Sequence, residues 1–232
     1  QDSTLRALSN VCRHNGTQVA QGAGNTARLV CPYHGWTYRL DGALASAPRL
    51  GAVKGFDRNE YALGTMQVQE FGPLILVNAT ATAQALELGE LKRRLDDSGW
   101  ERLRRVARRS YDLACNWKVY LENQRESYHV PIVHRESLGD QVATPLDQEG
   151  AWSGSLIPVV QTAGVMKDET TPFPPIKSLA GEALEGSHFL GLYPSTYFVA
   201  TTDCFWWMEI KPRGPERMEL VVGSGFPRET VA

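Results

Sequence analysis

The chain has 232 residues, of which 42% are hydrophobic and 22% are charged, and its net charge is −2. These values are typical of a globular protein, and the near-neutral charge gives no reason to expect nucleic acid or a membrane surface as a partner. No apolar run approaches the roughly 20 residues of a membrane span. Four cysteines are too few for a disulfide scaffold of this length, which favours a reducing, cytoplasmic compartment.

In chain order, the sequence predicts a small β domain, a helical connector and a mixed α+β domain. Residues 1–80 contain short β-prone runs, ARLVCPY and LILVNAT, separated by Gly-rich turns. Residues 81–110 are expected to form a charged helical connector, either a solvated helix or a docking surface for an acidic electron donor. Residues 111–232 are expected to begin with a helix from 115 to about 129 and, after a loop-rich stretch over 139–187, to end in strands around a turn near Asp203.

The segment CRHNGTQVAQGAGNTARLVCPYH carries the first group of candidate metal ligands. It places Cys12 and His14 in one short run and Cys31 and His34 in another. Zinc accepts two thiolates and two imidazoles, and so does a [2Fe–2S] cluster with two Cys on one iron and two His on the other. Two facing loops, each with one Cys and one His, favour the cluster. Gly35 allows close backbone approach, and Pro32 stiffens the second loop.

These residues resemble the Rieske motif, and the CPYHGW version resembles that of ring-hydroxylating oxygenases. The resemblance implies that Cys12 and Cys31 bind one iron of a [2Fe–2S] cluster and that His14 and His34 bind the other. Respiratory Rieske proteins carry an additional disulfide across these loops. The chain has no cysteine pair for it, which favours the low-potential oxygenase or ferredoxin branch.

A second group of candidate ligands lies in NWKVYLENQRESYHVPIVH. His129 and His134 would point roughly 140° apart on a continuous helix, so they can share a metal only if the helix breaks, and Pro131 between them predicts that break. Glu126 lies one turn before His129 and could hold its second ring nitrogen. Two unrelated histidines near a helix end and an exposed glutamate are the plainer interpretation.

The order of these motifs resembles the α subunit of Rieske non-haem iron oxygenases. The resemblance implies an antiparallel β Rieske domain followed by a helix-grip (START-like) catalytic domain with a central antiparallel sheet, an α+β fold. It also implies that His129 and His134 bind mononuclear Fe(II). Glu126 would be the bridging carboxylate to His34 of a neighbouring subunit in a homotrimer. Gln124 and Arg125 depart from the usual apolar residues of this stretch.

The family supplies the third iron ligand as an Asp near the C-terminus. We expect that segment to lie beyond the end of the chain, and the N-terminal part of the Rieske domain to be missing as well. Asp140, Asp147, Asp168 and Asp203 are present, but none lies in the matching context. Asp203 falls in a predicted hairpin turn, where Asp is common because its side chain hydrogen-bonds the local backbone.

The resemblance implies an enzyme that uses O₂ and electrons from a reductase or ferredoxin, ultimately from NAD(P)H, to hydroxylate a small organic, aromatic substrate. The alternative is a monooxygenase that demethylates or cleaves a quaternary ammonium compound. Proteins of another class, an electron carrier or a zinc-stapled binding module, stay open. The late aromatic side chains would form ordinary core, a wall for a flat substrate or a cage for a trimethylammonium group: Tyr193, Tyr197, Phe198, Phe205, Trp206 and Trp207.

Overall fold

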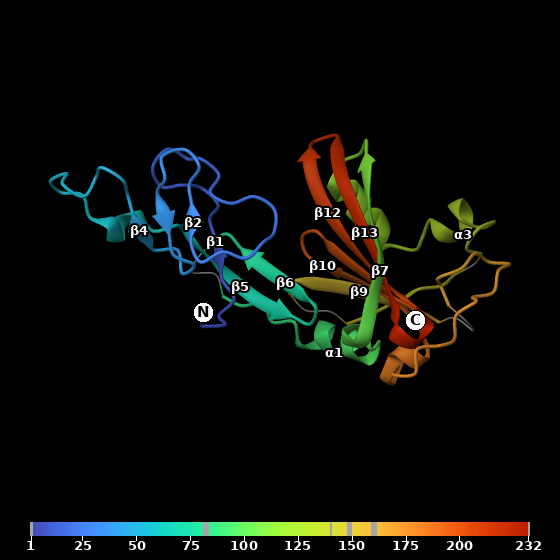
Figure 1. Ribbon diagram of the computed structural model, residues 1–232. Coiled ribbons are helices and arrows are strands. Elements are labelled where there is room, and N and C mark those ends of the chain that lie inside the picture. The colour runs from blue at the N-terminus through green and yellow to red at the C-terminus, as the bar shows by residue number, and fades with distance from the viewer. Residues whose placement is uncertain (1, 81–83, 140, 148–149, 159–161, 232) are drawn as a thin grey trace. The chain divides into compact units, whose positions relative to one another are not determined.

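The structure is a computed structural model that describes residues 2–80, 84–139, 141–147, 150–158 and 162–231 (Figure 1). The chain divides into two compact units, Gln1–Ala85 and Leu86–Ala232. No helix among the described residues has both the length and the apolar composition needed to cross a membrane. Each unit has its own core and is described separately.

The first unit consists of short antiparallel strands in two three-stranded sheets, ordered β1-β5-β6 and β2-β3-β4. Its strands are β1 Ala7–Leu8, β2 Leu29–Val30, β3 Thr37–Tyr38, β4 Leu44–Ser46, β5 Thr65–Phe71 and β6 Leu74–Asn78, with a 3-10 turn at Arg58–Tyr61. Both strands expected from the sequence in this unit are present, as β2 and β6. The core of the unit lies around Trp36 and Tyr38 and includes both Cys12 and Cys31.

The second unit is built on a seven-stranded antiparallel sheet in the order β7-β13-β12-β11-β10-β9-β8 (Figure 1). Its strands are β7 Leu103–Leu113, β8 Thr144–Pro145, β9 Trp152–Pro158, β10 Gly186–Leu192, β11 Thr196–Ala200, β12 Phe205–Gly214 and β13 Arg217–Pro227. The helices are α1 Gly89–Asp97, α2 Trp117–Arg125 and α3 Val130–Val133, and 3-10 turns lie at Trp100–Arg102, Gly181–Leu184 and Arg228–Thr230. The α+β architecture with a central antiparallel sheet is therefore confirmed.

Helix α2 packs against one face of this sheet. Asn116 caps the helix by accepting a hydrogen bond from the backbone N–H of Lys118 at 2.9 Å. Leu121 on its inner side belongs to a buried cluster with Tyr197 and Ile210. On the opposite face, Phe198 contacts Phe205 with ring centroids 6.0 Å apart. The alternation of side chains along a strand thus divides the late aromatic residues between two faces of the sheet.

The prediction of a helical connector over residues 81–110 is wrong for its second half. Residues 81–83 lie outside the described residues, α1 begins only at Gly89, and the chain from Leu103 onward is strand β7. This Arg-rich segment is the edge strand of the large sheet and pairs with β13 from Pro227 to Met218. Long-range pairing overrides its helix-like composition, and charged side chains suit an exposed sheet edge. In the loop-rich stretch, the sequence also missed β9.

Candidate metal centres and the cavity beside Glu126

Cys12 and Cys31 each begin a loop that closes in the same way. In the first loop, the Cys12 N–H donates to Thr17 O at 2.8 Å, and the Gly16 N–H donates to Cys12 O at 3.0 Å. In the second, the Cys31 N–H donates to Trp36 O at 2.8 Å, and the Gly35 N–H donates to Cys31 O at 3.1 Å. The two loops have the same backbone closure, although the histidine lies at a different position in each.

A glycine with positive φ occupies the same place in both loops. Gly16 has φ 74° and Gly35 has φ 71°, a left-handed conformation that side chains disfavour. The sequence analysis identified Gly35 but missed Gly16. Its place four residues after Cys12, like Gly35 after Cys31, is the signal that could have found it.

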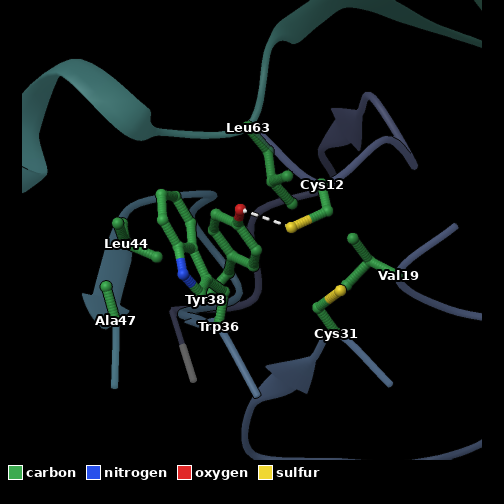
Figure 2. Close-up of a cluster of buried hydrophobic side chains, with 8 residues drawn as sticks. All are labelled: Cys12, Val19, Cys31, Trp36, Tyr38, Leu44, Ala47 and Leu63. Carbon is green, nitrogen blue, oxygen red and sulfur yellow. Dashed lines mark hydrogen bonds between the residues drawn. The ribbon is translucent and has the colours of Figure 1, made fainter. Parts of the chain in front are cut away.

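The four predicted cluster ligands divide into a buried pair and an exposed pair. Cys12 and Cys31 are 3% and 2% exposed (Figure 2), whereas His14 and His34 lie at the surface. The ring centroids of the two histidines are 4.7 Å apart. The ring of His14 stacks on Trp36 at 4.9 Å, which orients it. Two inner sulfur atoms and two outer imidazoles are the donor set of a [2Fe–2S] cluster with unlike irons, so the residues fit that group.

Tyr38 is a contact of the sulfur pair that the sequence analysis missed. Its hydroxyl lies 3.3 Å from Cys12 Sγ (Figure 2). The same hydroxyl accepts a hydrogen bond from the Arg13 N–H at 3.0 Å. Burial alone would raise the pKa of Cys12, but hydrogen bonds from Tyr38, from nearby backbone N–H groups and from Cys31 outweigh it and lower that pKa. The pKa of Tyr38 is raised, chiefly by burial. The site therefore favours a thiolate at Cys12, the form that binds metal.

The segment with His129 and His134 folds differently from the prediction. Helix α2 ends at Arg125, and Glu126 is extended with φ −119° and ψ 152°. The helix therefore breaks before His129 rather than at Pro131, which lies in the first turn of α3, where proline is tolerated. His129 and His134 flank α3 at its two ends, and their ring centroids are 5.3 Å apart.

Glu126 forms a compact set of contacts at this break. Its Oε2 accepts hydrogen bonds from the backbone N–H of Tyr128 at 2.5 Å and of His129 at 3.2 Å, while Oε1 contacts His129 Nδ1. Slight burial would raise the pKa of Glu126, but these hydrogen bonds lower it. The carboxylate thus holds both the backbone and the ring of His129. Asn123, which the sequence analysis missed, places Nδ2 3.5 Å from the same ring nitrogen.

Among the described residues, no carboxylate completes a three-ligand metal site with His129 and His134. Asp140 lies outside the described residues. Asp203 is buried in the turn between β11 and β12 and accepts hydrogen bonds from Thr162, Thr171 and Thr201 at 2.5 to 2.7 Å. Across the described ranges, no group of three or more His, Cys, Asp or Glu side chains is arranged around a single metal ion. His129 and His134 therefore fit an iron site in part, as two of its ligands.

A cavity of about 510 Å³ lies beside Glu126 in the second unit. Its walls come from the C-terminal end of α2, the segment that follows, and strands β8 to β11: Glu122, Arg125, Glu126, Ser127, Tyr128, Ala143, Pro145, Ser153, Gly154, Ser155, Phe189 and Tyr197. The Tyr197 hydroxyl donates to Gln124 O, which ties the end of α2 to the sheet. Of the late aromatic residues named from the sequence, Tyr197 lines this cavity.

Two family models match the chain. The Rieske [2Fe-2S] domain matches residues 1–57, and the ring hydroxylating alpha subunit catalytic domain matches residues 100–232. These matches cover the loops of Cys12 and Cys31 and the segment of His129 and His134. The chain therefore belongs to the ring hydroxylating alpha subunit family.

The chain is also similar to enzymes of quaternary ammonium compounds. It is 35% identical to a chloroplastic choline monooxygenase of Arabidopsis thaliana, over 58% of this chain and 35% of that protein. It is 29% identical to the glycine betaine monooxygenase oxygenase subunit of Pseudomonas aeruginosa, over 80% of this chain and 47% of that one. A solved quaternary ammonium Rieske monooxygenase bound to its substrate gamma-butyrobetaine aligns with a TM-score of 0.76 and 25% identity, over 98% of this chain and 60% of that one. The chain thus spans less than half the length of these two curated relatives.

Proposed function

We propose that this chain belongs to the oxygenase subunit of a Rieske monooxygenase that oxidises a small quaternary ammonium compound. The observation that carries the proposal is the cavity beside the Glu126–His129 pair, which combines aromatic and carboxylate side chains. The relatives named for choline, glycine betaine and gamma-butyrobetaine support it. They favour the quaternary ammonium alternative over the aromatic substrate that the sequence analysis put first.

Residues of the first unit would hold the cluster and set its environment. Cys12 and Cys31 would supply the inner thiolates, and His14 and His34 the outer imidazoles. With Cys12 as a thiolate, the Tyr38 hydroxyl would donate to its sulfur and stabilise the negative charge. The exposed histidines place the outer edge of the site at the surface, where a reductase or ferredoxin can approach. When bound, the cluster supplies single electrons and the mononuclear iron supplies the chemistry of O₂.

Residues of the second unit would hold the mononuclear iron through His129 and His134. A carboxylate at Nδ1 keeps the proton of the His129 ring on that nitrogen and leaves the Nε2 lone pair free for metal. Glu126 is therefore a positioning residue for His129. The third carboxylate ligand stays a prediction for a segment outside this chain.

The walls of the cavity have the chemistry to bind a trimethylammonium group. Phe189 and Tyr197 offer aromatic faces, and aromatic rings attract quaternary ammonium ions. Glu122 and Glu126 add negative charge on the neighbouring wall. A volume of about 510 Å³ suits a small organic molecule. The cavity excludes bulk water from part of the ligand and so strengthens these attractions.

The predicted partners are a reductase, with NAD(P)H as the ultimate donor, and further copies of this chain. Tyr33 is exposed beside His34, and Tyr128, Ile132 and Val133 are exposed around α3. Exposed apolar side chains at both metal centres are the surfaces that a homotrimer would bury, with Glu126 facing His34 of a second copy. A cytoplasmic location also stays a prediction.

The test uses the intact, iron-loaded protein with a reductase and NADH. We expect O₂ uptake that depends on a quaternary ammonium substrate, with formaldehyde or an aldehyde released in proportion. Neutral aromatic compounds of the same size should give no substrate-dependent uptake. Turnover of the aromatic compounds alone would contradict the proposal and restore the first expectation from the sequence.

A further inference from the structure

Arg125 is the feature of the cavity that the proposed function leaves unexplained. A quaternary ammonium ion is a cation, and a guanidinium in the wall of its binding site would repel it. Yet Arg125 lines the cavity together with Glu122, one helical turn earlier on α2. Arg125 is also one of the two residues that depart from the apolar residues usual in this stretch of the family.

The two charges lie on one face of the helix but do not neutralise each other. In the part of the chain that the structure describes, neither the Glu122 nor the Arg125 side chain forms an ion pair or a protein hydrogen bond. Side chains at i and i+3 are close enough to pair on a helix surface. Their separation leaves one anionic and one cationic group free to bind a ligand in the same cavity.

The guanidinium is held in place by an aromatic ring. Its Cζ lies 5.7 Å from the centre of the Tyr193 ring, which comes from the turn between β10 and β11. Arg125 also acts electrostatically on the hydroxyl of Tyr197, whose pKa is raised by burial and partly lowered by the arginine charge. A guanidinium whose charge lies over an aromatic ring still has planar N–H donors, and these can bind a carboxylate in a bidentate manner.

We infer that the cavity selects a zwitterion, a quaternary ammonium compound that carries a carboxylate, over a simple quaternary ammonium cation. Arg125 binds the carboxylate, and Glu122 with the aromatic walls holds the ammonium end. The inference rests on the proposed function and deepens it, because the named relatives include both a choline enzyme and enzymes of betaines. It assigns to Arg125 the choice between these two kinds of substrate.

The test compares two ligands that differ only at one end. Gamma-butyrobetaine carries a carboxylate, and butyltrimethylammonium has a methyl group in its place. Equilibrium binding of each is measured by calorimetry, without O₂, on the intact, metal-loaded protein. We expect the zwitterion to bind about tenfold or more tightly, since a hydrogen-bonded ion pair contributes at least that factor.

Three variants and one control variant separate the roles of the side chains. Arg125→Gln should weaken binding of gamma-butyrobetaine to the level of butyltrimethylammonium and leave the latter unchanged or slightly tighter. Arg125→Lys should keep part of the preference, because it keeps the charge but not the bidentate geometry. Glu122→Gln should weaken both ligands by the same factor. Lys118→Gln, which removes a positive charge from the same helix outside the cavity, should change neither.

Two results would overturn the inference and leave the proposed function intact. One is equal binding of the two ligands to the unchanged protein. The other is an Arg125→Gln variant that weakens the binding of both ligands equally. That result would mean that Arg125 supports the cavity through its contact with Tyr193 and does not bind the carboxylate. Failure of both ligands to bind the unchanged protein, with a neutral aromatic compound binding instead, would overturn the proposed function as well.

Discussion

The two candidate metal centres are built in opposite ways. In the first unit, two short loops close onto their own cysteines, so each ligand is placed by hydrogen bonds within about five residues. In the second unit, the two histidines flank a four-residue helix, and Glu126 and the end of α2 set their position. A site made of local loops can be recognised from spacing alone. For the second site, spacing indicates the two histidines but not where helix α2 ends, and that end sets their arrangement.

The largest expected effect is loss of the cluster when a buried cysteine is replaced. Cys31→Ser replaces a buried sulfur atom that we propose as a cluster ligand, and we expect the purified protein to lose its acid-labile sulfide and visible absorbance. Cys115→Ser is the matched control, because Cys115 lies in the second unit, and it should keep both signals. A Cys31→Ser protein with full sulfide content would contradict the assignment of Cys31 as a ligand of a [2Fe–2S] cluster in the first unit.

A second prediction concerns the buried His188 on β10, outside both centres. Burial and the charge of Arg94 lower its pKa to about 4 from the ordinary 6.5. As the pH falls from 6.5 to 4, the unfolded chain takes up a proton that the folded chain does not, so stability is lost in that window and is unaffected above it. The loss is about 3 kcal/mol at pH 4.

Urea unfolding as a function of pH tests this second prediction. Because carboxylates titrate in the same range, the relevant quantity is the difference between the unchanged protein and His188→Leu. We expect the variant to lose less stability on acidification. Parallel pH profiles for the two proteins would show that His188 takes up its proton equally in both states.

The Glu126 carboxylate tests the second centre directly. Glu126→Gln keeps the size of the side chain but weakens its hold on His129 Nδ1, so turnover should fall about 10- to 100-fold while both kinds of iron stay bound. Glu136→Gln, a nearby exposed change of the same kind, should have no effect. Normal turnover of the Glu126→Gln protein would remove the positioning role of the carboxylate.

The two loop glycines test whether the loops are equivalent. Gly16→Ala and Gly35→Ala each force a side chain into a left-handed conformation, without a steric clash at either site. Each should destabilise the first unit by about 1 kcal/mol in thermal or urea unfolding. Gly24→Ala has open space and no positive φ, so it should change stability least. Unequal losses of stability in Gly16→Ala and Gly35→Ala would mean that the two loops are not energetically equivalent.

The smallest expected effect is at Tyr38. Tyr38→Phe removes the hydroxyl beside Cys12 Sγ, so the cluster should still assemble and its reduction potential should fall. A hydrogen bond of about 1 kcal/mol corresponds to roughly 40 mV for one electron. Tyr61→Phe is the control in a redox titration, because Tyr61 packs against the same core and, among the described residues, forms no hydrogen bond to a sulfur atom. An unchanged reduction potential would show that the Tyr38 hydroxyl only accepts the hydrogen bond from the Arg13 N–H and does not affect the cluster.

Strand-like runs in the sequence predicted the β domain, residue spacing predicted both groups of candidate ligands, and the resemblance to Rieske oxygenases implied the central antiparallel sheet. It failed where distant contacts decide the structure. β7 is a strand since it pairs with β13, more than a hundred residues later. The early end of α2 depends on Glu126, whose carboxylate accepts hydrogen bonds from the backbone N–H groups of Tyr128 and His129. A continuing helix would have used these N–H groups in its own backbone hydrogen bonds. The role of the positive charge of Arg125 can be inferred only from the cavity that this side chain lines in the folded protein.

The most direct test of the account is the metal and sulfide content of the anaerobically purified protein, with an EPR spectrum after dithionite reduction. The account predicts two irons and two sulfides in a cluster with a low average g value, and additional iron that is lost when both His129 and His134 are changed to Ala. Stoichiometric zinc without sulfide would contradict it, and so would a total iron content that does not fall when both histidines are changed.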